Sequence, residues 1–298
     1  MKLVKFFWRV IAGVLRRAGA LATKLSDRSY SKSLPGLSSE DRKLIEANAI
    51  FRNRHVGQRC FIIGNGPSIG NQDLSFLAGE ITLVMNAFWK HDVVEEWQPS
   101  YYFLSDGLFF DRSGPSREFF EGLRNRVPRT VYFVPLSQRI VVSEDGLLPL
   151  DSTLFFSTQQ QFLGDALENN FDLSQPVPDV YTVAQLAIMA AIYLGCSPIY
   201  LLGLDHDWLG HHGEKDYYFF KGLALKDHPG NVGRLGPYDQ EMESMLACWK
   251  GYRKLQAIAE KHGIQILNAT EGGFLDVFER VSYQSIFEAG ARTAKCLP

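Results

Sequence analysis

The feature that most constrains this chain is a short apolar run that ends directly in a glycine-rich turn. Residues 59–63 have the composition of a buried strand, and Gly64-Asn65-Gly66-Pro67-Ser68 follow them without a break. Glycine permits close backbone approach, and proline is favoured in the first turn of a helix. A strand, a glycine turn and a helix in this order point backbone N–H groups at an anion. The sequence therefore predicts that these five turn residues bind a phosphate group.

Two familiar phosphate-binding motifs do not fit this turn. Its glycines follow the pattern G-x-G-x-x-x-G through Gly70, whereas the dinucleotide fingerprint is G-x-G-x-x-G. The lysine of an ordinary P-loop is also missing. The turn is thus predicted to bind a nucleotide-type ligand in some other way.

The rest of the chain alternates strand-like and helix-like segments. Apolar or β-branched runs at 81–86, 99–106, 129–134, 198–202 and 264–268 are typical of strands, and 182–194 and 239–262 have helical periodicity. This alternation predicts an α/β fold with a doubly wound, mostly parallel Rossmann-like sheet. Residues 136–180 are expected to form a loop-rich subdomain or lid. Residues 208–240 are expected to form a lid over the site, and residues 276–285 a short helix and docked terminus.

Polar residues stand where several of these strands end. Asn86 follows one strand. Its side chain is expected either to hydrogen-bond a base or ribose edge of the ligand or to close the strand in an Asx turn. Asp106 ends another strand, where open parallel sheets bind ligands.

The densest titratable cluster follows the strand at 198–202. It consists of Asp205, His206, Asp207, His211 and His212. Asp205 and Asp207 are oxygen donors of the kind that Mg²⁺ prefers, and Mg²⁺ is the one cofactor that the pattern suggests. The alternative is that Asp205 caps backbone groups and the histidines lie in a solvated loop.

Charge is distributed unevenly along the chain. Residues 1–25 contain six cationic side chains and no acidic one, which gives this segment a charge of +6. Because the whole chain has a net charge of −2, the remaining residues carry −8. An acidic body argues against nucleic acid as the main partner. Residues 1–25 have amphipathic helical periodicity, with charges too frequent for a membrane span. We expect this helix either to lie on an anionic membrane surface or to dock on protein.

We therefore expect two parts. Residues 1–38 form a basic amphipathic helix and a linker, and residues 39–298 form one catalytic body, in which Ser39 starts a short helix. Four cysteines lack metal-binding spacing and indicate a reducing compartment. Together these features predict a cytoplasmic protein that is peripheral on the inner face of the cytoplasmic membrane.

Three segments resemble known bacterial families. FIIGNGPSIGNQDLSFLAGEITLVMNAFW, YTVAQLAIMAAIYLGCSPIYLLGLDHDW and GIQILNATEGGFLDVFERVSY resemble the MptE-like family of polysaccharide gene clusters. The first two segments are also similar to the sialyltransferases of glycosyltransferase family 42. The match spans roughly residues 57–285 in order.

The sialyltransferase resemblance implies a CMP-sugar or related nucleotide sugar as donor and a glycan or lipid-linked acceptor. It implies that the phosphate lies on Asn65, Gly66 and Ser68, with the nucleoside near Asn86 and Thr182. Tyr217 or Tyr218 would supply a hydroxyl to the departing phosphate, and His206, His211, His212 and His228 are candidates for the base. The tyrosine expected two positions after Asp205 is replaced by Asp207.

The MptE-like resemblance implies instead transfer of diphosphate from ATP to a hydroxymethylpterin, with Mg²⁺ held by carboxylates such as Asp106, Asp205 and Asp207. Glycan assembly at the inner leaflet suits the basic N-terminal helix better, so the favoured prediction is a glycosyltransferase-like enzyme. A non-catalytic nucleotide-binding protein is the third alternative.

Overall fold

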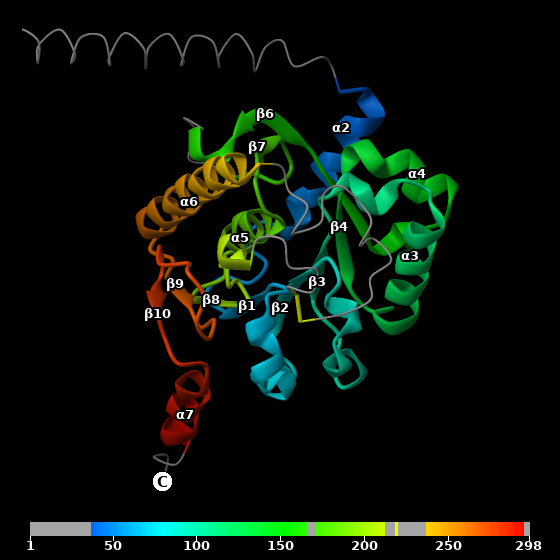
Figure 1. Ribbon diagram of the computed structural model, residues 1–298. Helices are drawn as coiled ribbons and strands as arrows, with labels where there is room; N and C mark the ends of the chain where they lie inside the picture. Colours follow the sequence, from blue (N-terminus) through cyan, green and yellow to red (C-terminus); the bar gives the residue numbers. More distant parts are fainter. Residues whose placement is uncertain (1–36, 166–170, 212–217, 220–236, 295–298) are drawn as a thin grey trace, which may run out of the picture. The chain divides into compact units, whose positions relative to one another are not determined.

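A computed structural model describes residues 37–165, 171–211, 218–219 and 237–294 (Figure 1). The chain divides into two compact units, Met1–Lys43 and Leu44–Pro298. α2 (Ser39–Glu46) begins after Ser38, whose Oγ accepts a hydrogen bond from the backbone N–H of Asp41 at 3.0 Å. The short helix expected at Ser39 is therefore confirmed, and the predicted helix over residues 1–25 lies outside the described residues.

The second unit is built on an eight-stranded sheet in which every recorded strand pair is parallel. Its strands lie in the order β10-β9-β8-β1-β2-β3-β4-β5. Their bounds are β1 Cys60–Ile63, β2 Ile81–Met85, β3 Tyr101–Phe103, β4 Val131–Pro135, β5 Thr153–Phe156, β8 Ile199–Leu202, β9 Ile266–Asn268 and β10 Glu279–Arg280. The predicted α/β class with a doubly wound parallel sheet is confirmed.

β1 lies inside the sheet and supplies side chains to both faces. Ile62 is in register with Leu83 of β2 on one side and Leu201 of β8 on the other. Cys60 and Ile62 belong to the apolar cluster that contains α5 and α6, whereas Phe61 stacks on Tyr200. A strand buried on both faces needs a continuous apolar run, which explains the composition of this segment.

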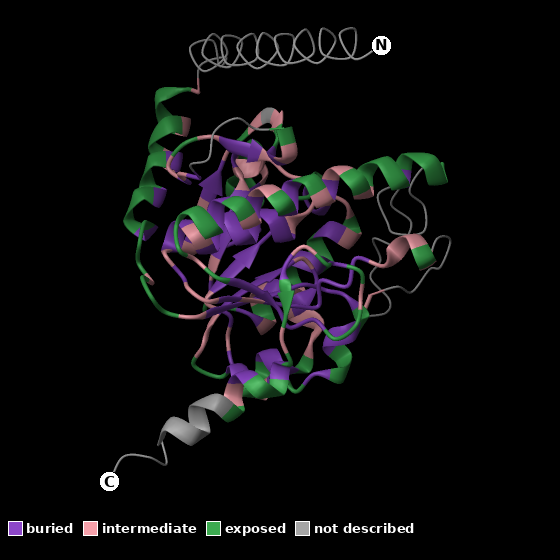
Figure 2. Ribbon diagram, turned by 90° about the vertical axis from the view of Figure 1, so that its left-hand side faces the viewer, coloured by how far each residue is buried: buried purple, intermediate pink, exposed green. Residues whose placement is uncertain are grey.

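Helices cover both faces of the sheet. In Figure 1, α5 and α6 lie on one side of β4, and α3 and α4 lie on the other. The bounds of the helices are α3 Gly114–Arg126, α4 Arg139–Glu144, α5 Val183–Leu194, α6 Tyr238–Lys261 and α7 Tyr283–Ala294. α5 is buried almost all round and ends at Gly195, whose φ of +80° few other residues adopt. Figure 2 shows the buried strands between more exposed helices.

Short 3₁₀ helices fill many of the connections. They are η1 Ala47–Phe51, η2 Pro67–Asn71, η3 Leu74–Leu77, η4 Phe88–Lys90, η5 Asp92–Glu95, η6 Gly107–Phe110, η7 Leu136–Gln138, η8 Leu150–Ser152, η9 Leu163–Asp165 and η10 Trp208–His211. The glycine turn therefore leads into the five-residue η2, and the longer helix that the sequence suggests there is wrong. A single short turn aligns few peptide dipoles, so its field is weaker than that of a full helix.

Two other segments differ from the sequence-based expectation. Residues 136–180 contain α4, the edge strand β5, and a separate two-stranded parallel sheet of β6 (Thr158–Phe162) and β7 (Val177–Asp179). The C-terminal segment contains β10 before α7, which begins at Tyr283. These strands have two to five residues, too few for a recognisable periodicity. Within the described ranges, no helix has both the length and the apolar character needed to cross a membrane.

Candidate functional site

The order of the strands singles out one place at the carboxyl edge of the sheet. The chain passes from β1 through β2, β3 and β4 to β5 in one direction, and β8 then pairs with β1 on its other side. In open parallel sheets, ligands bind in the crevice beyond the strand ends where the order reverses. Here that place lies between the residues that follow β1 (64–68) and those that follow β8 (203–207).

The loop after β8 gives the glycine turn an anion from the chain itself. The Ser68 backbone N–H donates to Asp205 Oδ1 at 3.2 Å, and its Oγ donates to Asp205 Oδ2 at 2.8 Å. Both residues are buried. Burial raises the pKa of Asp205, and the two hydrogen bonds from Ser68 act in the opposite direction. A carboxylate thus lies where the sequence predicts a phosphate.

The glycines of the two loops allow this close contact. A Cβ at Gly66 would lie 1.7 Å from Asp205 Oδ2, and one at Gly64 would lie 2.4 Å from the Gly203 carbonyl oxygen. The Gly66 N–H donates to that same carbonyl at 2.9 Å. The close approach that Gly64 and Gly66 permit is therefore between two segments of this chain. Pro67 is the exposed first residue of η2.

Asn65 connects the ends of β1 and β2. Its Nδ2 donates to the Met85 carbonyl at 2.9 Å, and its Oδ1 accepts from the Ala87 N–H at 3.1 Å. These two backbone groups flank Asn86. Asn65 therefore fixes the position of Asn86, while its own amide is engaged within the protein.

Asn86 lies at the carboxyl end of β2 in the left-handed region, with φ +50°. Its backbone is held by a bond from its N–H to the Phe103 carbonyl at 3.2 Å and by the Tyr102 hydroxyl, which donates to the Asn86 carbonyl at 2.7 Å. Its Oδ1 is buried and has no hydrogen-bond partner among the described residues. A buried polar atom without a partner is destabilising, so this oxygen is a candidate acceptor for a ligand donor.

A second polar arrangement joins the loop after β8 to α5 and α6. His206 Nε2 lies 2.7 Å from the Tyr252 hydroxyl, which lies 3.0 Å from Thr182 Oγ1. Thr182 precedes α5, and among the described residues its side chain makes no capping bond to that helix. No motif in the sequence points to Tyr252, so its contact with two predicted site residues is the main finding that the sequence missed.

The surroundings of His206 decide its chemistry. Its ring is buried and lies edge-on to Trp208 and Trp249, with centroids 4.9 and 5.7 Å away. Burial lowers the pKa of His206 to about 3, so the imidazole is neutral at physiological pH. A general base works best with a pKa near the working pH, so His206 is poorly suited to that role.

Asp207 and His211 form a neighbouring pair, with His211 Nε2 3.6 Å from Asp207 Oδ2. Asp205 has both oxygens engaged with Ser68, so the two carboxylates face different partners. Within the described ranges, no group of three or more His, Cys, Asp or Glu side chains is arranged to hold a metal ion. A magnesium site at Asp205 and Asp207 would need phosphate oxygens and waters to complete its shell, and it stays a prediction.

Residues 218 and 219 lie over the ends of the strands. The Phe219 N–H donates to the Asn65 carbonyl at 3.3 Å, and its ring lies 5.5 Å from that of His91. Burial, followed by the nearby charge of Asp106, raises the pKa of Tyr218 to about 12. Asp106 itself is exposed and caps η6 by accepting a hydrogen bond from the Leu108 N–H at 2.9 Å. This fragment of the predicted lid reaches the site, whereas His212, Tyr217 and His228 lie outside the described residues.

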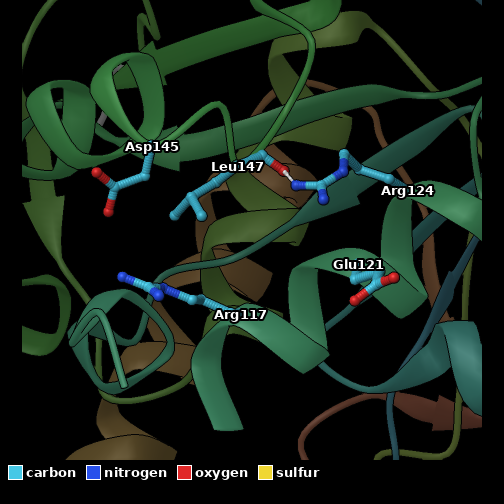
Figure 3. A pocket seen from close by; sticks show the side chains of 5 residues that line it. All are labelled: Arg117, Glu121, Arg124, Asp145 and Leu147. Atoms are coloured by element: carbon cyan, nitrogen blue, oxygen red, sulfur yellow. Dashed lines mark hydrogen bonds between the residues drawn. The ribbon is translucent and has the colours of Figure 1, made fainter. Parts of the chain in front are cut away.

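A pocket of about 310 Å³ lies elsewhere, beside α3 (Figure 3). It is lined by Arg117, Glu121, Arg124, Asp145 and Leu147. Arg124 donates to the carbonyl oxygens of Gly146 and Leu147, and Asp145 is paired with Arg112 at 3.0 Å. Its lining includes no residue that follows β1, β2 or β8, and two of its four charged residues, Arg124 and Asp145, serve internal contacts.

Nine chains of solved structures resemble this chain, and two of them are sialyltransferase complexes. One is the sialyltransferase CstII from Campylobacter jejuni in complex with the substrate analogue CMP-3FNeuAc. Its sequence is 16% identical to this chain, the TM-score is 0.46, and the alignment covers 76% of this chain and 86% of CstII. The sialyltransferase CST-II with a trisaccharide acceptor and CMP is 15% identical with a TM-score of 0.43, at the same coverage. No family model and no curated protein matches. The resemblance to the MptE-like family therefore stays a prediction, and these values do not bear on the reaction.

Proposed function

We propose that this protein is a glycosyltransferase-like enzyme that uses a nucleotide sugar, with CMP-sugars as the first donors to test, in surface-polysaccharide assembly. The observation that carries the proposal is the buried Oδ1 of Asn86, which has no partner among the described residues and lies one strand from the point where the strand order reverses. A base amino group or a ribose hydroxyl is the donor that this oxygen lacks. The transfer chemistry rests on the sequence resemblance described above.

The nucleotide would extend along the strand ends from Asn86 towards Thr182. The glycine turn is the less suitable phosphate position, because the Ser68 donors are engaged by Asp205 and a phosphate there would meet a carboxylate. The first turn of α5 is the better one, since the Thr182 side chain caps none of its N–H groups and its dipole favours an anion.

The described residues offer groups for both halves of a transfer. The raised pKa of Tyr218 keeps its phenol protonated, so it would donate a hydrogen bond to the departing phosphate. His211 beside Asp207 is the better candidate for a base that accepts the proton of an acceptor hydroxyl, because its ring is oriented by a carboxylate and partly exposed. The C–O bond to the nucleotide would break as the bond to the acceptor oxygen forms.

A thermal-shift panel tests the proposal. It uses CMP, a CMP-sugar, uridine and guanosine nucleotide sugars, and ATP with and without Mg²⁺. A nucleotide at a hundred times its Kd stabilises the folded state by about 2.7 kcal/mol, which corresponds to roughly 5–10 °C in a chain of this size. We expect the largest increase from one nucleotide sugar.

The variant Asn86→Gly serves as the matched test of the site. Glycine adopts the left-handed backbone of this position readily, and the two backbone bonds are kept, so the unliganded melting temperature should change little. The nucleotide-induced increase should fall. Stabilisation by ATP–Mg²⁺ alone would support the diphosphokinase alternative, and stabilisation by no nucleotide would contradict both.

A further inference from the structure

We infer that His206 and Tyr252 are positioning residues that orient the Thr182 hydroxyl as a hydrogen-bond donor to an anionic oxygen of the bound nucleotide. This inference rests on the proposed function, since it requires a nucleotide at the first turn of α5. Neither side chain contacts the ligand. They act through Thr182, which lies half-buried at the start of the helix.

The three groups form a continuous row from the interior to the site. His206 and Tyr252 are buried, with 7% and 0% of their surface exposed, and the two contacts of the row measure 2.7 and 3.0 Å. Tyr252 is fixed on α6 next to Cys248, which packs against Gln185 of α5. His206 is held by the two loops on either side of it, because the Asp205 carboxylate binds Ser68 and the Asp205 carbonyl accepts from the Phe274 N–H at 2.7 Å. His206 and Tyr252 are therefore held in place.

Protons can be arranged along this row in two directions. In the first, His206 Nε2–H donates to Tyr252, Tyr252 donates to Thr182, and the Thr182 proton is left to point outward. In the second, Thr182 donates to Tyr252 and Tyr252 donates to His206, which leaves only lone pairs facing the site. The phenol has a single proton, so the two directions exclude each other.

An anion at the site selects the first direction. A phosphate oxygen accepts hydrogen bonds and repels the lone pairs of a hydroxyl, so it binds only when Thr182 presents its proton. Burial lowers the pKa of His206, so its ring is neutral. One ring nitrogen then carries a proton, and the other can accept a hydrogen bond. The same row can thus adopt the direction that the ligand requires without any change of charge.

The contribution of the phosphate group can be measured separately from that of the nucleoside. The experiment compares the affinities of the full chain for CMP and for cytidine, by calorimetry, in wild type, Tyr252→Phe, Thr182→Val and the double variant. If a nucleotide with another base gives the largest increase in the thermal-shift panel, the monophosphate and nucleoside of that base are used in place of CMP and cytidine. Wild type should prefer the monophosphate, and each single variant should lose about tenfold of that preference while its cytidine affinity is unchanged.

The double variant tests the row itself. If Tyr252 acts through Thr182, adding Tyr252→Phe to Thr182→Val causes no further loss, because the group to be oriented is already missing. Thr182→Ser, which keeps the hydroxyl, should restore the wild-type preference. Tyr132→Phe is the matched control, since it also removes a buried phenol hydroxyl, one that donates to the Val127 carbonyl far from Thr182 in the sequence. It should leave both affinities unchanged.

The possible failures are distinguishable. Equal loss of CMP and cytidine affinity in Tyr252→Phe would show a general structural effect and overturn the inference, as would additive losses in the double variant. If wild type binds no nucleoside monophosphate at all, the proposed function fails, and the inference fails with it.

Discussion

The hydroxyl of Ser68 donates a hydrogen bond to the carboxylate of Asp205 at 2.8 Å, although 137 residues separate the two in the sequence. The bond joins the loop after β1 to the loop after β8, and both residues are buried. If Ser68 bound only a ligand phosphate, replacing it would not change the stability of the unliganded protein. A serine that satisfies a buried carboxylate contributes to folding itself.

Ser68→Ala should therefore destabilise the protein without ligand. The buried carboxylate loses one of its two donors from Ser68, which costs about 1–3 kcal/mol. Urea unfolding measures the effect. Ser143→Ala is the control, because that hydroxyl donates to backbone carbonyls on an exposed helix and its loss should change the free energy of unfolding by less than about 0.5 kcal/mol. Unchanged stability of Ser68→Ala, with loss of nucleotide binding alone, would assign Ser68 to the phosphate.

Gly66→Ala should be the most damaging of the small substitutions in the turn. Its Cβ would lie 1.7 Å from Asp205 Oδ2, so one of the two loops must move, at a cost of about 1–3 kcal/mol or more. Gly70→Ala is only four residues away and its Cβ meets nothing within 4 Å. The melting temperatures of the two variants should differ by several degrees. Equal values would show that the loops separate easily.

His206→Gln should weaken the dependence of stability on acid. The folded protein binds a proton at His206 only near pH 3, whereas an unfolded histidine does so near pH 6.5. The unfolded state thus holds more protons between these values, and stability falls as the pH falls through this window. From pH 7 to pH 5 this one group accounts for about 2 kcal/mol, which the variant should not lose.

Other groups do not obscure this comparison. Tyr252 and Cys248, which face this region from α6, have raised pKa values and stay neutral below pH 7. His55 and His91 also have pKa values lowered chiefly by burial, and they are present in both proteins. Denaturant unfolding at the two pH values gives the required free energies. Parallel losses in wild type and His206→Gln would mean that His206 is accessible to water.

His211→Gln should affect turnover more than binding, provided that the proposed transfer takes place. Loss of a general base reduces the rate of such a step by about 10²–10⁴ fold. Donor affinity should stay close to wild type, because the proposed nucleotide position involves Asn86 and Thr182. Release of the free nucleotide from the donor, followed with acceptor present, measures the rate. A variant with full turnover would remove His211 from the mechanism.

The fold was predictable from the sequence where elements are long or buried on all sides. The run at Cys60–Ile63 and the helices at Val183–Leu194 and Tyr238–Lys261 have strong apolar patterns, and the structure confirms them. β5, β6, β7 and β10 could not be recognised in the same way. Their pairing depends on neighbouring strands that are already in place, and this leaves little signal in two to five residues.

The sequence predicts that the candidate residues meet at one edge of the sheet, and it does not predict their contacts with one another. Parallel strands bring their carboxyl ends to one edge, which is why Asn86 and Asp205 are found at the same edge of the sheet. That Asp205 fills the turn, and that Tyr252 joins His206 to Thr182, depends on how loops and helices distant in sequence meet. The spacing of residues within a short segment of sequence carries no signal of such contacts.

The pairing of β1 with β8 also has a consequence for how the protein folds. Contacts between residues so far apart must overcome a large loop-closure entropy, and they form late compared with local structure. During synthesis the glycine turn leaves the ribosome well before Asp205 does. We therefore expect the turn to acquire its final shape only after about two thirds of the chain has been made, so a nascent chain that ends before β8 has β1 and the turn but no candidate site.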